Sequence, residues 1–392
     1  MDDELGEVLR QARARKRLSQ GKVGDRVGYS ASWVSRVESG EIQPEERALR
    51  DLCDVLDLPA EKVGLESDVN RRKVLALGLG VGIAAALPST AAAAEPEGVM
   101  ERSLFRLRDV APAPRTALVS SLAEARRLFH EAQYAELGRM LPILISGAVA
   151  SNTHDVAARA YALLAQLAIK NYKGFAWIAS ERARAQAELT GDPVVMGEAA
   201  QAMAITMRRA GEYQAAIEHL HEAAVRLDEK PEQLALRGSL LLTASYSAAQ
   251  AGWRGQAMEF VGEAEETATR RETAAQTLYI PGVFGLDQTS VYRISIHHAL
   301  GETDQALTYS SKVDPRGLPN AERRGRMCMD VARVWRDAGE PERAFGALRA
   351  LEQYAPQEAR RPKVRSITTE LLTTNGEIPG LRRFAQRIGV AA

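Results

Sequence analysis

The stretch LSQGKVGDRVGYSASWVSRVESGEIQP, residues 18–44, contains the most specific structural signals in the amino-terminal part of the chain. Ser19 precedes one short helical segment that ends at Gly28, and Ser30 precedes a second that ends at Gly40. Serine is favoured just before a helix, where its hydroxyl accepts from an unpaired backbone N–H, and glycine is favoured just after one. The spacing therefore predicts two short helices joined by a tight turn, which is a helix-turn-helix.

Helical signals continue on both sides of this stretch. Before it, apolar residues repeat at helical spacing: Leu5, Val8, Leu9 and Ala12. After it, Pro44 opens another helix, whose apolar face holds Leu49, Leu52, Cys53 and Leu56. We expect residues 1–66 to form one all-helical domain.

The pattern L-S-Q-x-x-V-x-x-x-V-G-x-S-x-x-x-V-S-x-x-E-x-G-x-x-x-P resembles the phage-repressor (Xre/Cro) type of DNA-binding domain. The resemblance extends over about sixty residues. It implies a five-helix, lambda-repressor-like fold that binds double-stranded operator DNA. One departure is Gly24, where the family usually has alanine, and glycine costs up to roughly 1 kcal/mol of helix stability.

Local charge agrees with DNA binding. The whole chain is balanced, with 51 Lys+Arg against 51 Asp+Glu, so any charged partner must be recognised locally. Between residues 10 and 36 the only acid is Asp25, whereas the bases are Arg10, Arg13, Arg15, Lys16, Arg17, Lys22, Arg26 and Arg36. A basic face in a neutral chain is typical of phosphate contact, although a solvated charged helix is the alternative interpretation.

Position in the motif assigns roles to individual residues. The second helix of the motif, ASWVSRVES, corresponds to the recognition helix, whose first turn should enter the major groove. Arg36 is the candidate for a bidentate contact to guanine. The resemblance implies a phosphate contact for Gln20 and an internal ion pair between Arg13 and Glu38. The predicted DNA-binding set is Gln20, Ala31, Ser32, Trp33, Ser35, Arg36, Arg17 and Lys22.

The recognition helix also contains three large apolar side chains. Val34 and Val37 should face the core of the domain. Trp33 has two equally weighted interpretations, which are contact with a sugar or thymine methyl group and packing against a neighbouring helix.

Residues 67–99 form a connector that resembles a twin-arginine export signal. Arg71 and Arg72 precede an apolar run, but a domain stands in front of it, and export signals begin chains. The apolar run Val74–Leu87 has fourteen residues, fewer than the roughly 20 that span a bilayer. We favour an interdomain connector whose apolar helix packs on the repeats or on a second subunit, followed by a Pro/Ala linker. A membrane anchor is the alternative.

Residues 100–392 contain an internal repeat, in which a glycine is followed five residues later by an alanine. The copies are Gly211/Ala216, Gly252/Ala257, Gly301/Ala306 and Gly339/Ala344, spaced by about forty, fifty and forty residues. Weaker copies lie in EAQYAELGRML and KNYKGFAWIASERA. The units resemble tetratricopeptide repeats, with a longer and irregular period. We expect an α-solenoid of degenerate helix pairs, interrupted by a loop in RRETAAQTLYIPGVFGLDQ, residues 270–288.

The first helix of each pair should line the concave face of this solenoid. Placing the glycines in register predicts an effector-binding set on that face: Gln201, Arg208, Tyr246, Gln250, Gln288, Ser295, His298, Arg333 and Arg336. Such a groove suits a peptide or another anionic ligand. Exposed polar residues on an ordinary helix surface are the alternative interpretation.

Composition sets limits on function. Hydrophobic residues make up 45% and aromatics only 5%, which suits packed helices better than sheets. Cys53 and Cys328 are the only cysteines, which fits a reducing compartment. The sequence has no metal-ligand spacing, no cofactor motif and no nucleophile–base pairing, so we expect neither an enzyme nor a cofactor.

The two regions together resemble the peptide-pheromone-sensing regulators of Gram-positive bacteria and related actinobacterial regulators. The resemblance implies a cytoplasmic, homodimeric transcription regulator whose repeats bind a peptide, small-molecule or protein effector. The alternative is a scaffold or membrane-tethered protein that uses the repeats for protein–protein interaction.

Overall fold

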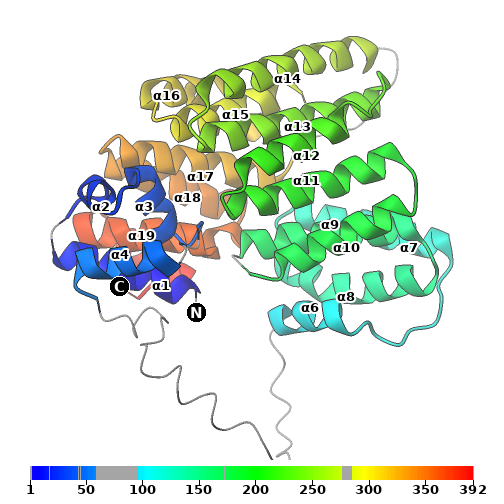
Figure 1. Cartoon of the computed structure of the whole chain (residues 1–392), viewed down its shortest axis with the longest axis horizontal. Coiled ribbons are helices and arrows are strands. Elements are labelled where there is room, and N and C mark those ends of the chain that lie inside the picture. The colour runs from blue at the N-terminus through cyan, green and yellow to red at the C-terminus, as the bar shows by residue number, and fades with distance from the viewer. Residues whose placement is uncertain are drawn as a thin grey trace, which may run out of the picture. The chain divides into compact units, whose positions relative to one another are not determined.

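The computed structural model describes residues 2–16, 18–42, 44, 46–58, 96–171, 173–275 and 285–391. Over these residues the chain is helical, with no strand, as predicted. It divides into two compact units, Met1–Ala94 and Glu95–Ala392, which are described separately below (Figure 1).

The first unit contains helices α1 (Asp2–Arg15), α2 (Gln20–Val27), α3 (Ala31–Glu38) and α4 (Glu46–Leu56). The two predicted caps form: the Ser19 hydroxyl accepts from the N–H of Lys22, and the Ser30 hydroxyl accepts from the N–H of Trp33. Between α2 and α3, Gly28 has a φ of +77°, the left-handed conformation that glycine adopts without strain. The helix-turn-helix is thus confirmed.

The core of this unit is the set of apolar faces that the sequence predicts. It includes Leu9, Ala12, Val23, Val34, Val37, Leu49, Leu52, Cys53 and Leu56. The fifth expected helix lies outside the described residues, as does the connector up to residue 95.

Gly24 has a structural reason that the sequence comparison does not provide. A Cβ atom there would lie 2.5 Å from the carbonyl oxygen of Tyr29, closer than real Cβ contacts come. The turn residues Tyr29 and Ser30 lie against α2 at this point, so the alanine usual in the family would force the backbone apart. The helix-propensity cost of glycine therefore accompanies a close approach of two backbone segments.

The second unit begins with α6 (Pro96–Phe105), so residues 96–99, which we expected in the linker, are helical. It continues as pairs of helices. These are α7 (Arg115–His130) with α8 (Tyr134–Ala150), α9 (His154–Lys170) with α10 (Ala176–Glu188), α11 (Pro193–Arg209) with α12 (Tyr213–Ala224), α13 (Pro231–Gln250) with α14 (Arg254–Ala275), α15 (Leu286–Ala299) with α16 (Thr303–Lys312), α17 (Ala321–Asp337) with α18 (Pro341–Tyr354), and α19 (Pro362–Asn375) with α20 (Leu381–Ile388).

The glycine and alanine of each repeat copy have the predicted structural roles. Gly211, Gly252, Gly301 and Gly339 adopt φ values of +89°, +82°, +78° and +76° in the turns inside the pairs. The matching alanines at 216, 257, 306 and 344 are all fully buried. A small residue there lets the two helices of a pair approach closely.

The structure of the first helix pair, α7 and α8, shows why its copy of the repeat, EAQYAELGRML, is weak in the sequence. Ala132 stands in the turn between α7 and α8 and has a positive φ of 56°. Leu137, five residues later, is fully buried. The geometry of the repeat is present, but neither the glycine nor the alanine is.

The expected loop at residues 270–288 is shorter than predicted. Helix α14 continues to Ala275 and α15 starts at Leu286. The segment RRETAA contains no helix breaker, so the helix extends through it. Pro281 and Gly282, on which the prediction was based, lie outside the described residues.

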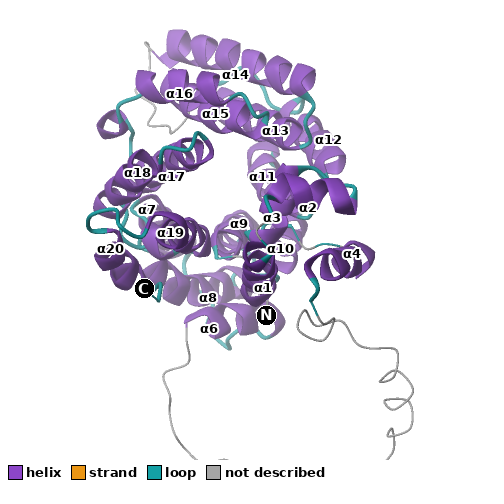
Figure 2. Ribbon diagram, turned by 90° about the vertical axis from the view of Figure 1, so that its left-hand side faces the viewer, coloured by secondary structure: helices purple, strands orange, loops and turns teal. Residues whose placement is uncertain are grey.

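The first helices of successive pairs contact one another from α7 through α9, α11, α13 and α15 to α17, and α17 in turn contacts α7. We call these the inner helices. Figure 2 shows how the unit curls so that its last pairs return to its first.

A buried ion cluster joins the two ends of this turn. Lys170 at the end of α9 lies 2.8 Å from Glu322 of α17 and 2.5 Å from Glu358. Glu358 also pairs with Arg361 and accepts a hydrogen bond from the hydroxyl of Tyr134. We call this set the clasp. It links residues more than 150 positions apart in the chain.

None of the described helices is both long and apolar enough to cross a membrane. The apolar run 74–87 lies outside the residues that this search covers.

Candidate functional site

Helix α3 presents the surface that the motif assigns to DNA. Ala31 and Ser32, in its first turn, are exposed, and Ser35 and Arg36 are half-buried. Val34 and Val37 are 1% and 2% exposed and face the core, as predicted. One side of the helix therefore anchors it while the other remains accessible.

The structure describes two of the three basic residues in the predicted DNA-binding set. Lys22 on α2 is exposed. The Nε of Arg36 donates to the carbonyl oxygen of Ser32 at 3.4 Å, one turn back on the same helix. Arg17 lies outside the described residues.

Glu38 holds the motif together from inside. It is 4% exposed, and its two carboxylate oxygens accept from Nε and Nη2 of Arg13 at 2.5 and 2.8 Å. This confirms the internal ion pair and gives Arg13 a structural role. The amide of Gln20 also donates to Glu38, at 3.0 Å. That bond uses one of the two N–H donors of the Gln20 amide and fixes the amide at the start of α2.

Trp33 packs, which is one of its two predicted interpretations. Its ring is partly buried against the core and stacks on the ring of Tyr29 at a centroid distance of 3.8 Å. Tyr29 is 41% exposed and stands in the turn. The sequence analysis missed Tyr29, because this residue lies in the turn before α3 and no helical periodicity relates it to Trp33.

The predicted effector-binding residues fall on the inner helices α11, α13, α15 and α17, but many are engaged in bonds between those helices. The Gln201 amide donates to Thr243 at 3.0 Å and to the carbonyl oxygen of Ser239. Ser295 donates to Asp330 at 2.6 Å, and Arg333 lies 3.6 Å from the same carboxylate. These bonds tie α11 to α13 and α15 to α17.

A second group gathers at the carboxyl ends of α15 and α17. His298 and Arg336 both contact Asp337, at 2.6 and 2.7 Å. Burial lowers the pKa of His298, and nearby Arg333 lowers it further, although the bond to Asp337 acts in the opposite direction. Gln250 is half-buried.

Three members of the predicted set remain: Arg208, Tyr246 and Gln288. The Arg208 guanidinium lies over the ring of Tyr246, with its central carbon 4.7 Å from the ring centroid. Gln288 is 5% exposed, and its Oε1 has no hydrogen-bond partner among the described residues.

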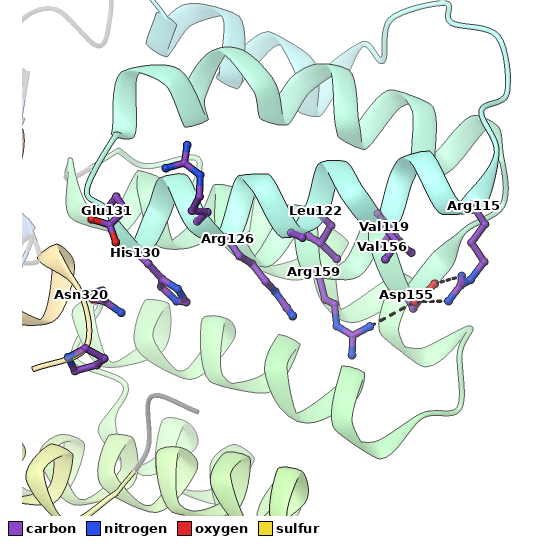
Figure 3. A pocket seen from close by; sticks show the side chains of 13 residues that line it. Arg115, Val119, Leu122, Arg126, His130, Glu131, Asp155, Val156, Arg159 and Asn320 are labelled. Carbon is purple, nitrogen blue, oxygen red and sulfur yellow. Dashed lines mark hydrogen bonds and ion pairs between the residues drawn. The ribbon is translucent and has the colours of Figure 1, made fainter. Parts of the chain in front are cut away.

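A pocket of about 880 Å³ lies on α7 and α9 and was missed by the sequence analysis. Figure 3 shows its lining, which includes Arg115, Arg126 and Arg159 from these helices and Asn320 before α17. The bases are paired: Arg115 with Asp155 at 2.7 Å, and Arg126 and Arg159 with Glu198 of α11. The weak copies of the repeat in this part of the chain left no register from which to predict these residues.

The two units define the class of the protein: a helix-turn-helix protein with a carboxy-terminal helical repeat region. Residues 4–64 match the family model described as a helix-turn-helix domain, so the first unit is such a domain. No curated protein matches the chain. Among solved structures, the chain is similar to Bacillus thuringiensis PlcR in complex with the peptide PapR7 and DNA. The identity is 13% and the TM-score is 0.36, over 79% of this chain and 95% of that one.

Proposed function

We propose that the protein is a cytoplasmic, sequence-specific transcription regulator that binds operator DNA as a homodimer and responds to an effector through its repeats. The main support for this proposal comes from the first unit. Residues 4–64 match the helix-turn-helix model, and α3 is packed against the core on one side and accessible on the other. A helix presented in this way fits the major groove.

Charge supports the same role. Arg15, Lys22 and Arg26 are exposed on the helices that flank α3. Bases in these places contact phosphates and fix the position of the domain on the duplex, while Ser32, Ser35 and Arg36 read base edges. A single short domain covers one half-site, so two copies are expected on each operator.

The repeat unit supplies the second part of the proposal. The inner helices α11, α13, α15 and α17 carry the arginine, tyrosine, glutamine and histidine side chains of the predicted effector-binding set. The pocket on α7 and α9 has a volume within the range of small-molecule sites. An effector bound to these helices would act by changing the population of DNA-binding-competent dimers.

An electrophoretic mobility assay of the full-length protein tests this function. The protein should shift promoter DNA, with an affinity that falls steeply between about 50 and about 200 mM salt. The Lys22→Ala variant should bind all fragments more weakly and lower the salt slope by about 1. The matched control is Arg343→Ala on α18, an exposed base of the repeat unit, which should change nothing. Salt-independent binding, or none, would favour a scaffold role instead.

A further inference from the structure

Four side chains from four successive inner helices form a cluster. Arg208 of α11 lies over the ring of Tyr246 of α13, at 4.7 Å, and Arg326 of α17 lies over the ring of Tyr292 of α15, at 5.0 Å. Both tyrosines are 7% exposed, whereas both arginines are partly exposed. The tyrosine rings are therefore buried, and the arginine side chains that stack on them are the more exposed members of the cluster.

Arg208 differs from the other arginines that stack on aromatic rings. Those in the described part of the chain each have a carboxylate within 4.0 Å: Arg293 has Glu265, Arg326 has Asp330, Arg343 has Glu340 and Arg387 has Glu352. For Arg208, no carboxylate partner occurs among the described residues. Burial lowers the pKa of its guanidinium, and the positive charge of Arg326 lowers it further.

Tyr292 shows the sign of the local potential. Burial alone would raise the pKa of its phenol, but Arg326, Arg323 and Arg208 outweigh burial, and the net direction is downward. Arg208, Arg323 and Arg326 thus all act on the buried ring of Tyr292. Asp330 and Glu322 balance the charge of Arg326, whereas stacking on Tyr246 compensates only part of the cost of the buried charge on Arg208.

We propose that Arg208 and Arg326, supported by Tyr246 and Tyr292, bind an oxyanion, which is a carboxylate or phosphate group of a ligand. The planar guanidinium group of arginine can donate two parallel hydrogen bonds to either a carboxylate or a phosphate. Gln288 lies one turn before Tyr292 on the same face of α15, and its buried Oε1 accepts no hydrogen bond from the residues that the structure describes. An N–H group next to the oxyanion of the ligand would supply a donor. The inference rests on the proposed sensory role of the repeats.

The test measures the melting temperature of the full-length protein during titration with three probes at constant ionic strength: sodium phosphate, N-acetylglycine and sodium chloride. N-acetylglycinamide serves as the uncharged control. An oxyanion bound at one site raises the melting temperature with a saturable dependence on concentration, whereas excluded salts act without saturation. A response to phosphate alone assigns a phosphate ligand, and one to N-acetylglycine alone assigns a carboxylate.

Substitutions of Arg208 and Arg343 test where the oxyanion that raises the melting temperature is bound. Arg208→Met should abolish the saturable rise and leave the protein without probe at least as stable as before, because it removes an uncompensated charge. Arg343→Met, which removes a stacked arginine that already has a carboxylate, should keep the rise. If Arg208→Met does not fold, Arg208→Lys serves as the test variant. Lysine keeps the positive charge but lacks the planar guanidinium group, so the saturable rise should weaken severalfold.

The proposal is overturned if neither oxyanion gives a saturable rise above chloride, or if the Arg208 variants that fold keep it in full. A mobility assay on the same preparations separates this result from the proposed function. DNA binding without an oxyanion response removes only the site, and an oxyanion response without DNA binding removes only the regulator.

Discussion

Gly24 and Gly21 stand in the same short helix and have opposite surroundings. A Cβ at 24 would meet the Tyr29 carbonyl oxygen at 2.5 Å, whereas a Cβ at 21 would meet the Ala31 Cβ at an ordinary 3.9 Å. The sequence shows two glycines that weaken a helix. Only the structure separates the one that the turn requires from the one it does not.

Gly24→Ala should therefore destabilise the helix-turn-helix by about 1–3 kcal/mol, because the overlap with backbone exceeds the gain in helix propensity. Gly21→Ala, its matched control, should be neutral or stabilising by up to about 1 kcal/mol. Hydrogen exchange of the α2 and α3 amides in the full-length protein measures both. Equal protection in the two variants would contradict the close approach at 24.

Residue-level prediction from the sequence succeeded where a motif position has a fixed structural role. Ser19, Ser30 and the pair Arg13–Glu38 all form the predicted contacts. It failed for Tyr29, whose partner depends on how the turn presents the ring. It also could not show that Ser295 and His298 are engaged by acids of α17, because that requires the register between neighbouring helix pairs.

The helix pairs depend on small residues at the crossing point. Ala216 in α12 is fully buried, and its neighbour Ala215 is exposed. The glycine–alanine spacing predicted these pairs in the later part of the chain. It could not predict the first pair, where Ala132 and Leu137 produce the same geometry with other residues.

Ala216→Leu should destabilise the repeat unit by about 1–3 kcal/mol through overpacking, and Ala215→Leu should stay within about 0.5 kcal/mol of the parent. Urea unfolding followed by circular dichroism measures both changes. A harmless Ala216→Leu would show that the two helices of this pair do not approach closely in solution.

The clasp closes the repeat unit on itself. Burial would raise the pKa of Glu358, but Arg361 and Lys170 outweigh burial and hold the pKa at about 2. Lys170 and Arg323 likewise hold the pKa of Glu322 far below its usual range against its burial. No local sequence pattern indicates this cluster, because its members lie on different repeats that meet only after a full turn of the unit.

Lys170→Met should cost about 3–5 kcal/mol, because it leaves two buried carboxylates without their shared cation. Lys312→Met, at an exposed lysine stacked on Tyr309, is the control and should cost less than about 1 kcal/mol. Thermal unfolding of each variant measures the difference. Similar melting temperatures for the two variants would argue against a closed unit.

The same carboxylates predict an acid limit to stability. Because their pKa values are lower in the folded than in the unfolded protein, their contribution is complete above about pH 5 and is lost as the pH falls toward about 2. The parent should lose stability steeply over this range, and Lys170→Met should lose less. Urea unfolding at several pH values between about 2 and 7 measures both slopes, and parallel slopes would contradict the ion pairing.

Selection of binding sites from random duplexes by the full-length protein shows whether α3 reads DNA sequence. The parent should enrich a two-fold symmetric motif. Arg36→Ala should lose preference for a guanine in each half-site, at a cost of about 1–3 kcal/mol, and keep the rest of the motif. No enriched motif, or the same motif with both proteins, would contradict sequence reading by α3.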